Sequence, residues 1–306
     1  MRAPSQALSS LAIAALLTNA FIWGISWWPF RYLADKGLHS LWATALMHSL
    51  ITVSLWLWYR RASVSKPEAP QPTLKLVALL VAVGITNCAF NWALTIGEVV
   101  RVVLLFYLMP IWTLLFARIF LHERLTLISW LRIALCLGGA MLVLAPKDLP
   151  ISITTLPMPN SLADWLGVIG GIGFAATNVA LRACAVAGAS TRIISLSMFG
   201  GGALLPGLLA IALTISLTIP PLPGPQLDWL LVLLLLTLGF LLSNLALQYG
   251  AARLPANIIA AVMPSEIIFA TVSAILIAGE EFTQRLLIGG ILILIATLFS
   301  IFHTQK

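Results

Sequence analysis

Glu266 is the side chain in this sequence that is best placed to do chemistry, because it is a lone carboxyl group inside a long apolar segment. A charged side chain at the centre of a bilayer costs at least about 2.5–3.5 kcal/mol, so it is expected to face a cavity or a partner. One interpretation is a proton-coupling or amine-binding site. The other is a protonated structural residue that binds a backbone carbonyl left free by Pro264, two residues earlier.

Amide side chains in two other apolar segments could form a polar wall for a substrate. Asn87 and Asn91 are four residues apart, as are Asn244 and Gln248, so each pair shares one face of a helix. The functional interpretation is hydrogen bonding to a substrate. The alternative is interhelical hydrogen bonding, worth about 0.6–2 kcal/mol per contact in membranes. The sequence leaves both open.

Aromatic residues could surround a ring or a cation in the same region. Trp23 and Trp27 lie in the first apolar segment and Tyr107 in the fourth, although packing against lipid or other helices is the alternative role for the tryptophans. Four polar residues complete the candidate substrate-binding set: Ser26, Thr177, Asn178 and Asn257. No residue is a candidate for covalent catalysis.

Three further residues have two interpretations each. His48 could relay protons to Glu266, but a packing role is favoured because its segment is not expected to line the centre of a cavity. Arg101 could attract a carboxylate, but we favour a side chain that extends to the lipid headgroups. Glu280 precedes the last apolar segment, where we expect a solvated residue that caps that helix.

Composition places these residues in a membrane protein. The chain has 306 residues, of which 60% are hydrophobic and 9% charged, with a mean hydropathy of +1.03, whereas soluble domains carry about 25% charged residues. Its net charge of +7 comes from basic residues scattered over short loops rather than a basic stripe, which excludes nucleic-acid binding. The three cysteines form no CxxC motif, and we expect them to be small buried hydrophobes.

The fold class predicted is an all-α membrane protein, because the apolar segments are about as long as a spanning helix. Ten segments qualify: about 8–31, 40–59, 74–95, 99–121, 126–145, 163–184, 191–217, 227–249, 254–278 and 283–303. Prolines at positions 29, 110 and 264 predict kinks in the first, fourth and ninth of them.

An internal repeat divides the chain into two halves. The stretch N-W-A-L-T-I-G at 91–97 returns as N-L-A-L-Q-Y-G at 244–250, and L-M-P and H-E-R-L-T return as V-M-P and G-E-E-F-T. We therefore expect a first five-helix repeat at 1–147, a linker at 148–159 and a second repeat at 160–306. Five helices per half place the second half upside down in the membrane, an arrangement typical of transporters.

The basic residues support this topology. With the N-terminus in the cytoplasm, twelve of the seventeen lysines and arginines fall on the cytoplasmic side, as the positive-inside rule requires. The same count places the C-terminus in the cytoplasm.

These motifs resemble those of the drug/metabolite transporter superfamily, and most closely its EamA-type branch. The resemblance rests on Trp23-Gly24 followed by Arg31, on M-P within the fourth and ninth segments, and on H-E-R-L-T and G-E-E-F-T. It implies ten helices in a five-plus-five inverted repeat, and a central cavity lined mainly by helices 1, 3, 4, 6, 8 and 9. Helices 5 and 10 would be peripheral. Members similar to this chain commonly move amino acids or other small metabolites, often outward.

The sequence predicts a secondary transporter of the bacterial inner membrane that moves small organic metabolites, amino acids or similar amphipathic compounds above all, by alternating access. The resemblance alone implies that the direction is export. A proton-coupled exporter of cationic drugs and a non-transporting scaffold are the alternatives. Expected partners are a small-molecule substrate, the lipid bilayer and, for the antiporter, protons. No cofactor or metal is expected, because Walker A, H-E-x-x-H and G-x-S-x-G motifs are lacking, and an enzyme is disfavoured. Monomer and homodimer remain open.

Overall fold

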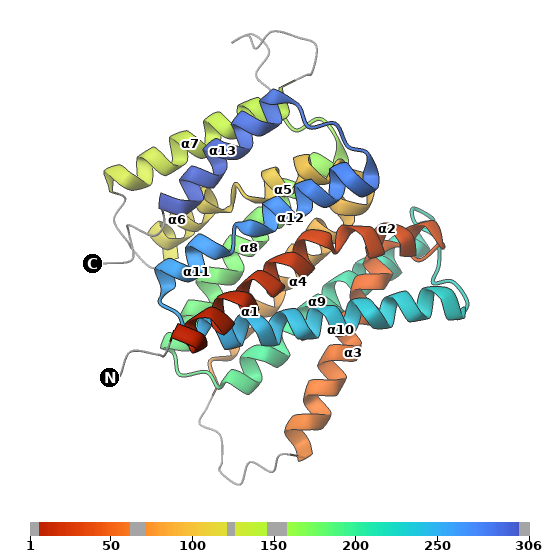
Figure 1. Cartoon of the computed structure of the whole chain (residues 1–306). Coiled ribbons are helices and arrows are strands. Elements are labelled where there is room, and N and C mark those ends of the chain that lie inside the picture. Colours follow the sequence, from red (N-terminus) through yellow and green to blue (C-terminus); the bar gives the residue numbers. More distant parts are fainter. Residues whose placement is uncertain (1–5, 62–70, 121–125, 146–157, 300–306) are drawn as a thin grey trace.

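The computed structural model describes residues 6–61, 71–120, 126–145 and 158–299 (Figure 1). These ranges consist of helices joined by short loops and turns, and they contain no strand. Eight helices in this part of the chain are long and apolar enough to cross a membrane, and two shorter apolar helices bring the number to ten. The prediction of an all-α membrane protein with ten spanning helices is confirmed.

The helices follow the predicted segments closely. The first half contains α1 (Gln6–Ile25), α2 (Trp27–Asp35), α3 (Ser40–Arg61), α4 (Thr73–Ile96), α5 (Val99–Phe106), α6 (Met109–Phe120) and α7 (Leu127–Leu144). The second half contains α8 (Leu162–Val186), α9 (Thr191–Ile215), α10 (Leu227–Ala251), α11 (Ala256–Val262), α12 (Ser265–Ser273), the π-helix η1 (Ala274–Ala278) and α13 (Gln284–Leu298). In Figure 1, α8 runs against the direction of α1, as an inverted repeat requires.

Three membrane helices are broken, and each break lies at or close to a proline. The first is interrupted at Ser26, between α1 and α2, three residues before Pro29. In the fourth, α5 ends before Tyr107 and α6 resumes at Met109, next to Pro110. The ninth breaks between α11 and α12 at Pro264. Proline lacks the N–H that would continue the backbone ladder and its ring clashes with the preceding turn, so these breaks confirm the predicted kinks.

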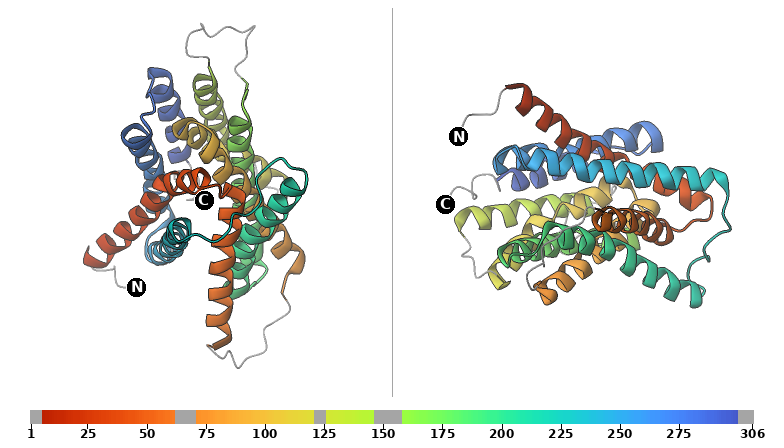
Figure 2. Two further views of the ribbon diagram at one scale, coloured as in Figure 1. Left: turned by 90° about the vertical axis from the view of Figure 1, so that its right-hand side faces the viewer. Right: turned by 90° about the horizontal axis from the view of Figure 1, so that it is seen from below.

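Glycines allow several helices to approach closely. A Cβ on Gly24 of α1 would lie 2.7 Å from Phe269 Cβ and 2.9 Å from the Glu266 carbonyl oxygen, both on α12. Gly139 of α7 and Gly289 of α13 meet in the same way, each with its hypothetical Cβ within 2.8 Å of the other's carbonyl oxygen. Such small residues are common where membrane helices pack. Figures 1 and 2 show the α7–α13 pair at one edge of the bundle, where helices 5 and 10 were expected.

Candidate functional site

A cavity of about 370 Å³ lies among helices from both halves. It has a volume suited to a small organic ligand. The residues that line it are Asn19, Trp23, His48, Val83, Thr86, Asn87, Phe90, Phe106, Tyr107, Met109, Phe174, Met198, Phe199, Phe240, Asn244, Leu247, Met263, Pro264, Glu266 and Thr297. The wall therefore includes α3, α9 and α13 in addition to the helices implied by the resemblance.

Glu266 and Tyr107 form the polar centre of this cavity. Tyr107 directly follows α5, and Glu266 lies in the first turn of α12, so each residue sits beside the break in its membrane helix. Both side chains are buried, and the tyrosine hydroxyl donates a hydrogen bond to Glu266 Oε2 at 3.2 Å. The partly positive N-terminus of α12 favours a carboxylate at this position. Two broken helices, one from each half, thus meet through an acid and a phenol.

Aromatic rings cover much of the remaining wall. The rings of Trp23 and Phe240 pack edge to face with centroids 4.7 Å apart. Phe106 packs against Phe90 at 4.4 Å and against Phe174 at 5.4 Å. Rings at these separations attract one another and present both faces and edges to a ligand. The wall can therefore hold an apolar or aromatic body and can attract a cation.

Two amide side chains in the wall have their nitrogens fixed by the protein. Asn19 Nδ2 donates to the carbonyl oxygen of Ser243 at 3.0 Å and to its hydroxyl at 2.6 Å. Asn87 Nδ2 donates to the carbonyl oxygen of Val83 at 2.9 Å. A carbonyl oxygen only accepts, so the amide nitrogen must face it in each case. The Oδ1 atoms of Asn19 and Asn87 are left without a hydrogen-bond partner within the described ranges.

His48 also lines the cavity, although its helix was not expected to reach the centre. Its Nδ1 lies 2.9 Å from the carbonyl oxygen of Thr44, so Nδ1 is the ring nitrogen that carries the proton. Its ring packs against Gly202 of α9, where a Cβ would overlap the imidazole. The close approach of α9 to α3 places this part of α3 beside the cavity. The histidine therefore both packs against α9 and lines the cavity.

Five of the twelve predicted substrate-binding residues line this cavity: Trp23, Asn87, Tyr107, Asn244 and Glu266. Gln248 is exposed and donates to Asn244 Oδ1 at 2.6 Å, so it touches the wall only through that residue. Asn257 lies in α11, but its side chain is outside the described part of the structure.

The other five predicted residues lie away from the cavity wall, and the reasons are local. Ser26 Oγ donates to the Trp23 carbonyl oxygen at 2.8 Å, and Thr177 Oγ1 donates to that of Gly173 at 3.0 Å, so both hydroxyls are satisfied by their own helices. Asn178 is exposed.

The remaining two join neighbouring helices instead. Trp27 donates its indole N–H to Ser273 Oγ at 2.9 Å. Asn91 donates its Nδ2 to Thr44 Oγ1 at 3.0 Å.

Sequence reasoning missed Asn19, Thr86 and the phenylalanines of the wall. Asn19 had a usable signal, since it is a polar residue one helical turn before Trp23 in an apolar segment. The phenylalanines had none, because phenylalanine is equally common in packed cores and facing lipid.

A second polar region, the paired face, lies where α2, α5, α8 and the segment before α13 come together. We define it by Arg31, Arg101, Asp164 and Glu280. The Glu280 carboxylate accepts the backbone N–H groups of Val99 at 2.7 Å and Val100 at 3.2 Å, which begin α5. It also lies 3.5 Å from Arg31 Nη2. Glu280 therefore caps a helix of the first half, and the expectation that it caps the following helix is wrong.

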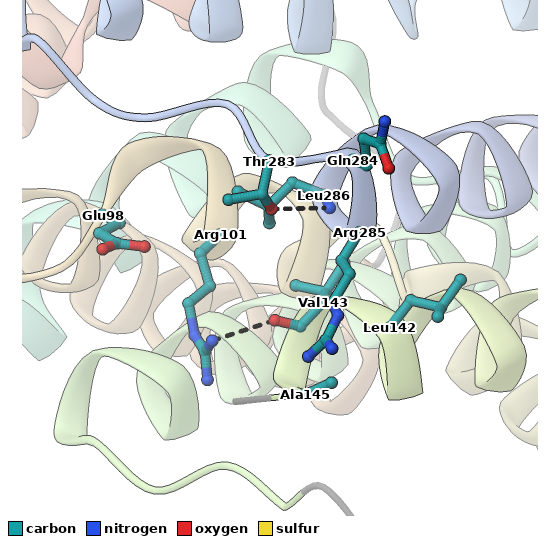
Figure 3. Close-up of a pocket in the computed structure, with 9 residues that line it drawn as sticks. All are labelled: Glu98, Arg101, Leu142, Val143, Ala145, Thr283, Gln284, Arg285 and Leu286. Carbon is teal, nitrogen blue, oxygen red and sulfur yellow. Dashed lines mark hydrogen bonds between the residues drawn. The ribbon is translucent and has the colours of Figure 1, made fainter. Parts of the chain in front are cut away.

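Arg101 and Asp164 form the other part of the paired face. Arg101 Nε and Nη2 donate to the two carboxylate oxygens of Asp164 at 2.7 and 2.9 Å, a bidentate pair. Arg101 Nη1 also donates to the carbonyl oxygen of Val143 at 3.0 Å (Figure 3). Its side chain is thus held by the protein rather than extended to lipid headgroups, which corrects the favoured interpretation. Both carboxylates of the paired face belong to the second half and both guanidinium groups to the first.

A third contact between the halves is exposed. Lys36, just after α2, places its Nζ 2.9 Å from Asp228 Oδ2 in the first turn of α10. The hydrogen bond to the Asp228 carboxylate raises the pKa of Lys36 above its usual value. Among the described residues, no group of three His, Cys, Asp or Glu side chains could hold a metal ion.

Comparisons with known proteins agree with this architecture. A solved structure titled "Crystal structure of protein" is similar to this chain with a TM-score of 0.56 and 17% sequence identity. The match covers 95% of this chain and 96% of that chain, and it concerns the fold alone. A comparison with curated proteins gave no match. The sequence profile of the EamA-like transporter family matches residues 10–145 and 161–302. With both halves matched, the chain belongs to the EamA-like transporter family, whose members are membrane transporters of small molecules.

Proposed function

We propose that this protein is a secondary transporter that exports small amphipathic metabolites carrying an amino group, amino acids among them, from bacteria by alternating access. The observation that carries the proposal is the cavity between two inverted halves, with the Glu266–Tyr107 hydrogen bond where two broken helices meet. Broken helices that meet near the middle of a bundle are typical of substrate sites in secondary transporters. The aromatic wall would hold the apolar part of the substrate and Glu266 its amino group.

The paired face supports alternating access. Its ion pairs and the Glu280 cap all join the first half to the second, so the halves are held together on that side. With the termini in the cytoplasm, as the basic residues indicate, this side faces outward. The cavity includes Leu247 and Thr297, near the cytoplasmic ends of α10 and α13. These contacts support our inference of a state closed to the outside, from which export would require the paired face to open.

A proton-coupled exporter of organic cations is the second candidate. It is favoured by one observation: among the described residues that line the cavity, Glu266 is the acid and none is a lysine or arginine. A lone carboxyl group that binds either a proton or a cation could couple the two fluxes. This candidate shares the cavity and the gate with the first, and differs in requiring a proton gradient.

Transport by the purified protein in liposomes tests both candidates. We expect uptake or release of a subset of amino-group metabolites down their gradients, and movement of none of them would contradict the proposal.

Glu266→Gln separates the two mechanisms. An antiporter should lose exchange driven by a pH gradient at any substrate concentration. A facilitator should show a weaker apparent affinity for its substrate and keep downhill flux when the substrate is saturating. Glu281→Gln, which removes an acid outside the cavity, is the matched control.

A further inference from the structure

The cavity wall offers a ligand more hydrogen-bond acceptors than donors. Glu266 contributes a carboxyl group whose Oε2 already accepts from Tyr107. Asn19 and Asn87 each donate from Nδ2 to a backbone carbonyl, and their Oδ1 atoms have no partner in the described ranges. Buried acceptors without a donor are unfavourable. Both oxygens are shielded in the present arrangement, so a ligand that brings N–H donors would reach them after a rotation of the amide side chain.

Other polar groups of the wall add to the same imbalance. Thr86 and Thr297 donate their hydroxyl protons to carbonyl oxygens of their own helices, at 2.8 and 2.9 Å, which leaves their oxygens as acceptors. His48 uses its Nδ1 proton on the Thr44 carbonyl oxygen, so in the neutral ring Nε2 is an acceptor as well.

Among the described residues of the wall, the donors that remain are neutral. They are the indole N–H of Trp23, the second N–H of Asn87 Nδ2 and the Nδ2 group of Asn244, whose Oδ1 accepts from Gln248. The cationic side chains of Arg31 and Arg101 are engaged at the paired face. A carboxylate on a bound ligand would therefore share the cavity with Glu266 and find no described cation to compensate its charge.

We infer that the preferred substrate is a primary amine with an apolar or aromatic body and without a free carboxylate, rather than a zwitterionic amino acid. An ammonium group supplies three N–H donors and one positive charge, which matches an acid surrounded by acceptors. The aromatic faces of the wall attract the same cation. A ligand carboxylate would lose its hydration without gaining a partner, which is strongly unfavourable at a low dielectric constant. This inference rests on the proposed function and narrows its substrate class.

A set of probes with one phenyl body tests the inference on the purified full-length protein at neutral pH. The probes are 2-phenylethylamine, phenylalaninamide, phenylalanine and 3-phenylpropionate, and calorimetry gives their dissociation constants. We expect the two amines without a carboxylate to bind at least about ten-fold more tightly than phenylalanine, since ten-fold corresponds to about 1.4 kcal/mol. The propionate should bind most weakly. Equal or tighter binding of phenylalanine would overturn the inference.

Glu266→Gln identifies the group responsible. The variant should weaken 2-phenylethylamine by about ten-fold or more and leave the uncharged probe 3-phenyl-1-propanol within about two-fold, because only the ammonium needs the charge. An equal loss for both probes would mean a structural role for Glu266 and would count against the inference. If the variant does not fold, the probe series on the unaltered protein still decides. Amino-acid transport without a preference for amines would leave the proposed function standing and remove this inference.

Discussion

The paired face and the cavity wall use ionisable side chains in opposite ways. At the paired face, each carboxylate of the second half meets a guanidinium group of the first, and Glu280 also caps the start of α5. In the cavity, the partner that Glu266 has among the described residues is the neutral hydroxyl of Tyr107. Under the proposed alternating access, the charges paired across the halves would hold one conformation closed, whereas an acid without a described counter-charge would be available to a ligand or a proton.

The paired face and the cavity also contribute differently to the energetics of transport. Opening the paired face separates opposite charges and frees the first N–H groups of α5, which is costly unless water or a new partner replaces those contacts. Binding in the cavity, by contrast, adds a partner to a group that lacked one. A substrate can offset the cost of opening only if it binds the open state more tightly than the closed one.

The largest effect is expected from Arg101→Ala, on the stability of the fold. The change leaves Asp164 buried without its partner, and removing one member of a buried ion pair costs about 3 kcal/mol, or somewhat less here because the arginine is partly exposed. We expect the free energy of unfolding in detergent to fall by roughly 2–3 kcal/mol. Chemical denaturation followed by tryptophan fluorescence measures the change.

The matched control for this variant removes both charges. Arg101→Gln with Asp164→Asn should be more stable than Arg101→Ala, because no uncompensated carboxylate remains. If the double variant is the less stable of the two, the ion pair is not what holds this part of the paired face.

Gly24→Ala should have the next largest effect, this time on the cavity. Its Cβ would lie 2.7 Å from Phe269 Cβ and 2.9 Å from the Glu266 carbonyl oxygen, so α12 must move away from α1. Overpacking of this kind costs about 1–3 kcal/mol, and the displaced Glu266 should bind ligands less tightly. Thermal unfolding and binding of the cavity probes measure the two effects.

Gly200→Ala provides the control, because nothing lies within 4 Å of the Cβ it would add. It should leave both stability and binding unchanged. A similar loss in both variants would mean that glycine flexibility, rather than the close packing of α1 on α12, is what matters.

Glu280→Gln should change the population of states more than the stability of the fold. A hydrogen bond to a charged group is worth about 1.5–3 kcal/mol, and the amide keeps part of it. A loss of about 1.4 kcal/mol would shift the equilibrium about ten-fold toward the state open at the paired face. The measurement is the rate at which a cysteine at position 240, in the cavity wall, reacts with an impermeant maleimide added outside. An unchanged rate would contradict the gating role, and Glu281→Gln is the control.

The two regions also differ in how far the sequence could predict them. The ten helices, the inverted repeat and the breaks near Pro110 and Pro264 follow from hydrophobic length and proline chemistry, which act locally. Glu266 could be recognised because an acid inside an apolar segment is energetically costly whichever way the helix is rotated about its axis.

What could not be predicted depends on the rotation of each helix and on partners from the other half. Spacing places Ser26 or Thr177 on a helix face but does not reveal that each hydroxyl already bonds its own backbone. The partner of Arg101 is 63 residues away in the other half, and no local pattern marks Asp164 as more than a residue of a helix start. The paired face is therefore a product of tertiary packing.

The smallest expected effect separates the buried contacts of the paired face from the exposed one beside it. Lys36→Ala removes the contact with Asp228, which also joins the two halves but is exposed to solvent. Exposed ion pairs are screened by water and salt, so we expect the labelling rate at position 240 to stay within about two-fold of the unaltered protein.

If the effect of Lys36→Ala is small, the reason cannot be that Lys36 is already uncharged in the unaltered protein. The Asp228 carboxylate raises the pKa of Lys36, so any stabilisation from the pair is present below the ordinary lysine pKa and is lost only as the pH rises through the higher value of the folded protein. At neutral pH the lysine is fully charged and the pair is intact. If Lys36→Ala nevertheless accelerated labelling as much as Glu280→Gln does, contact between the halves at any depth would suffice to close this side. Burial of the Glu280 cap would then not be what distinguishes the gate.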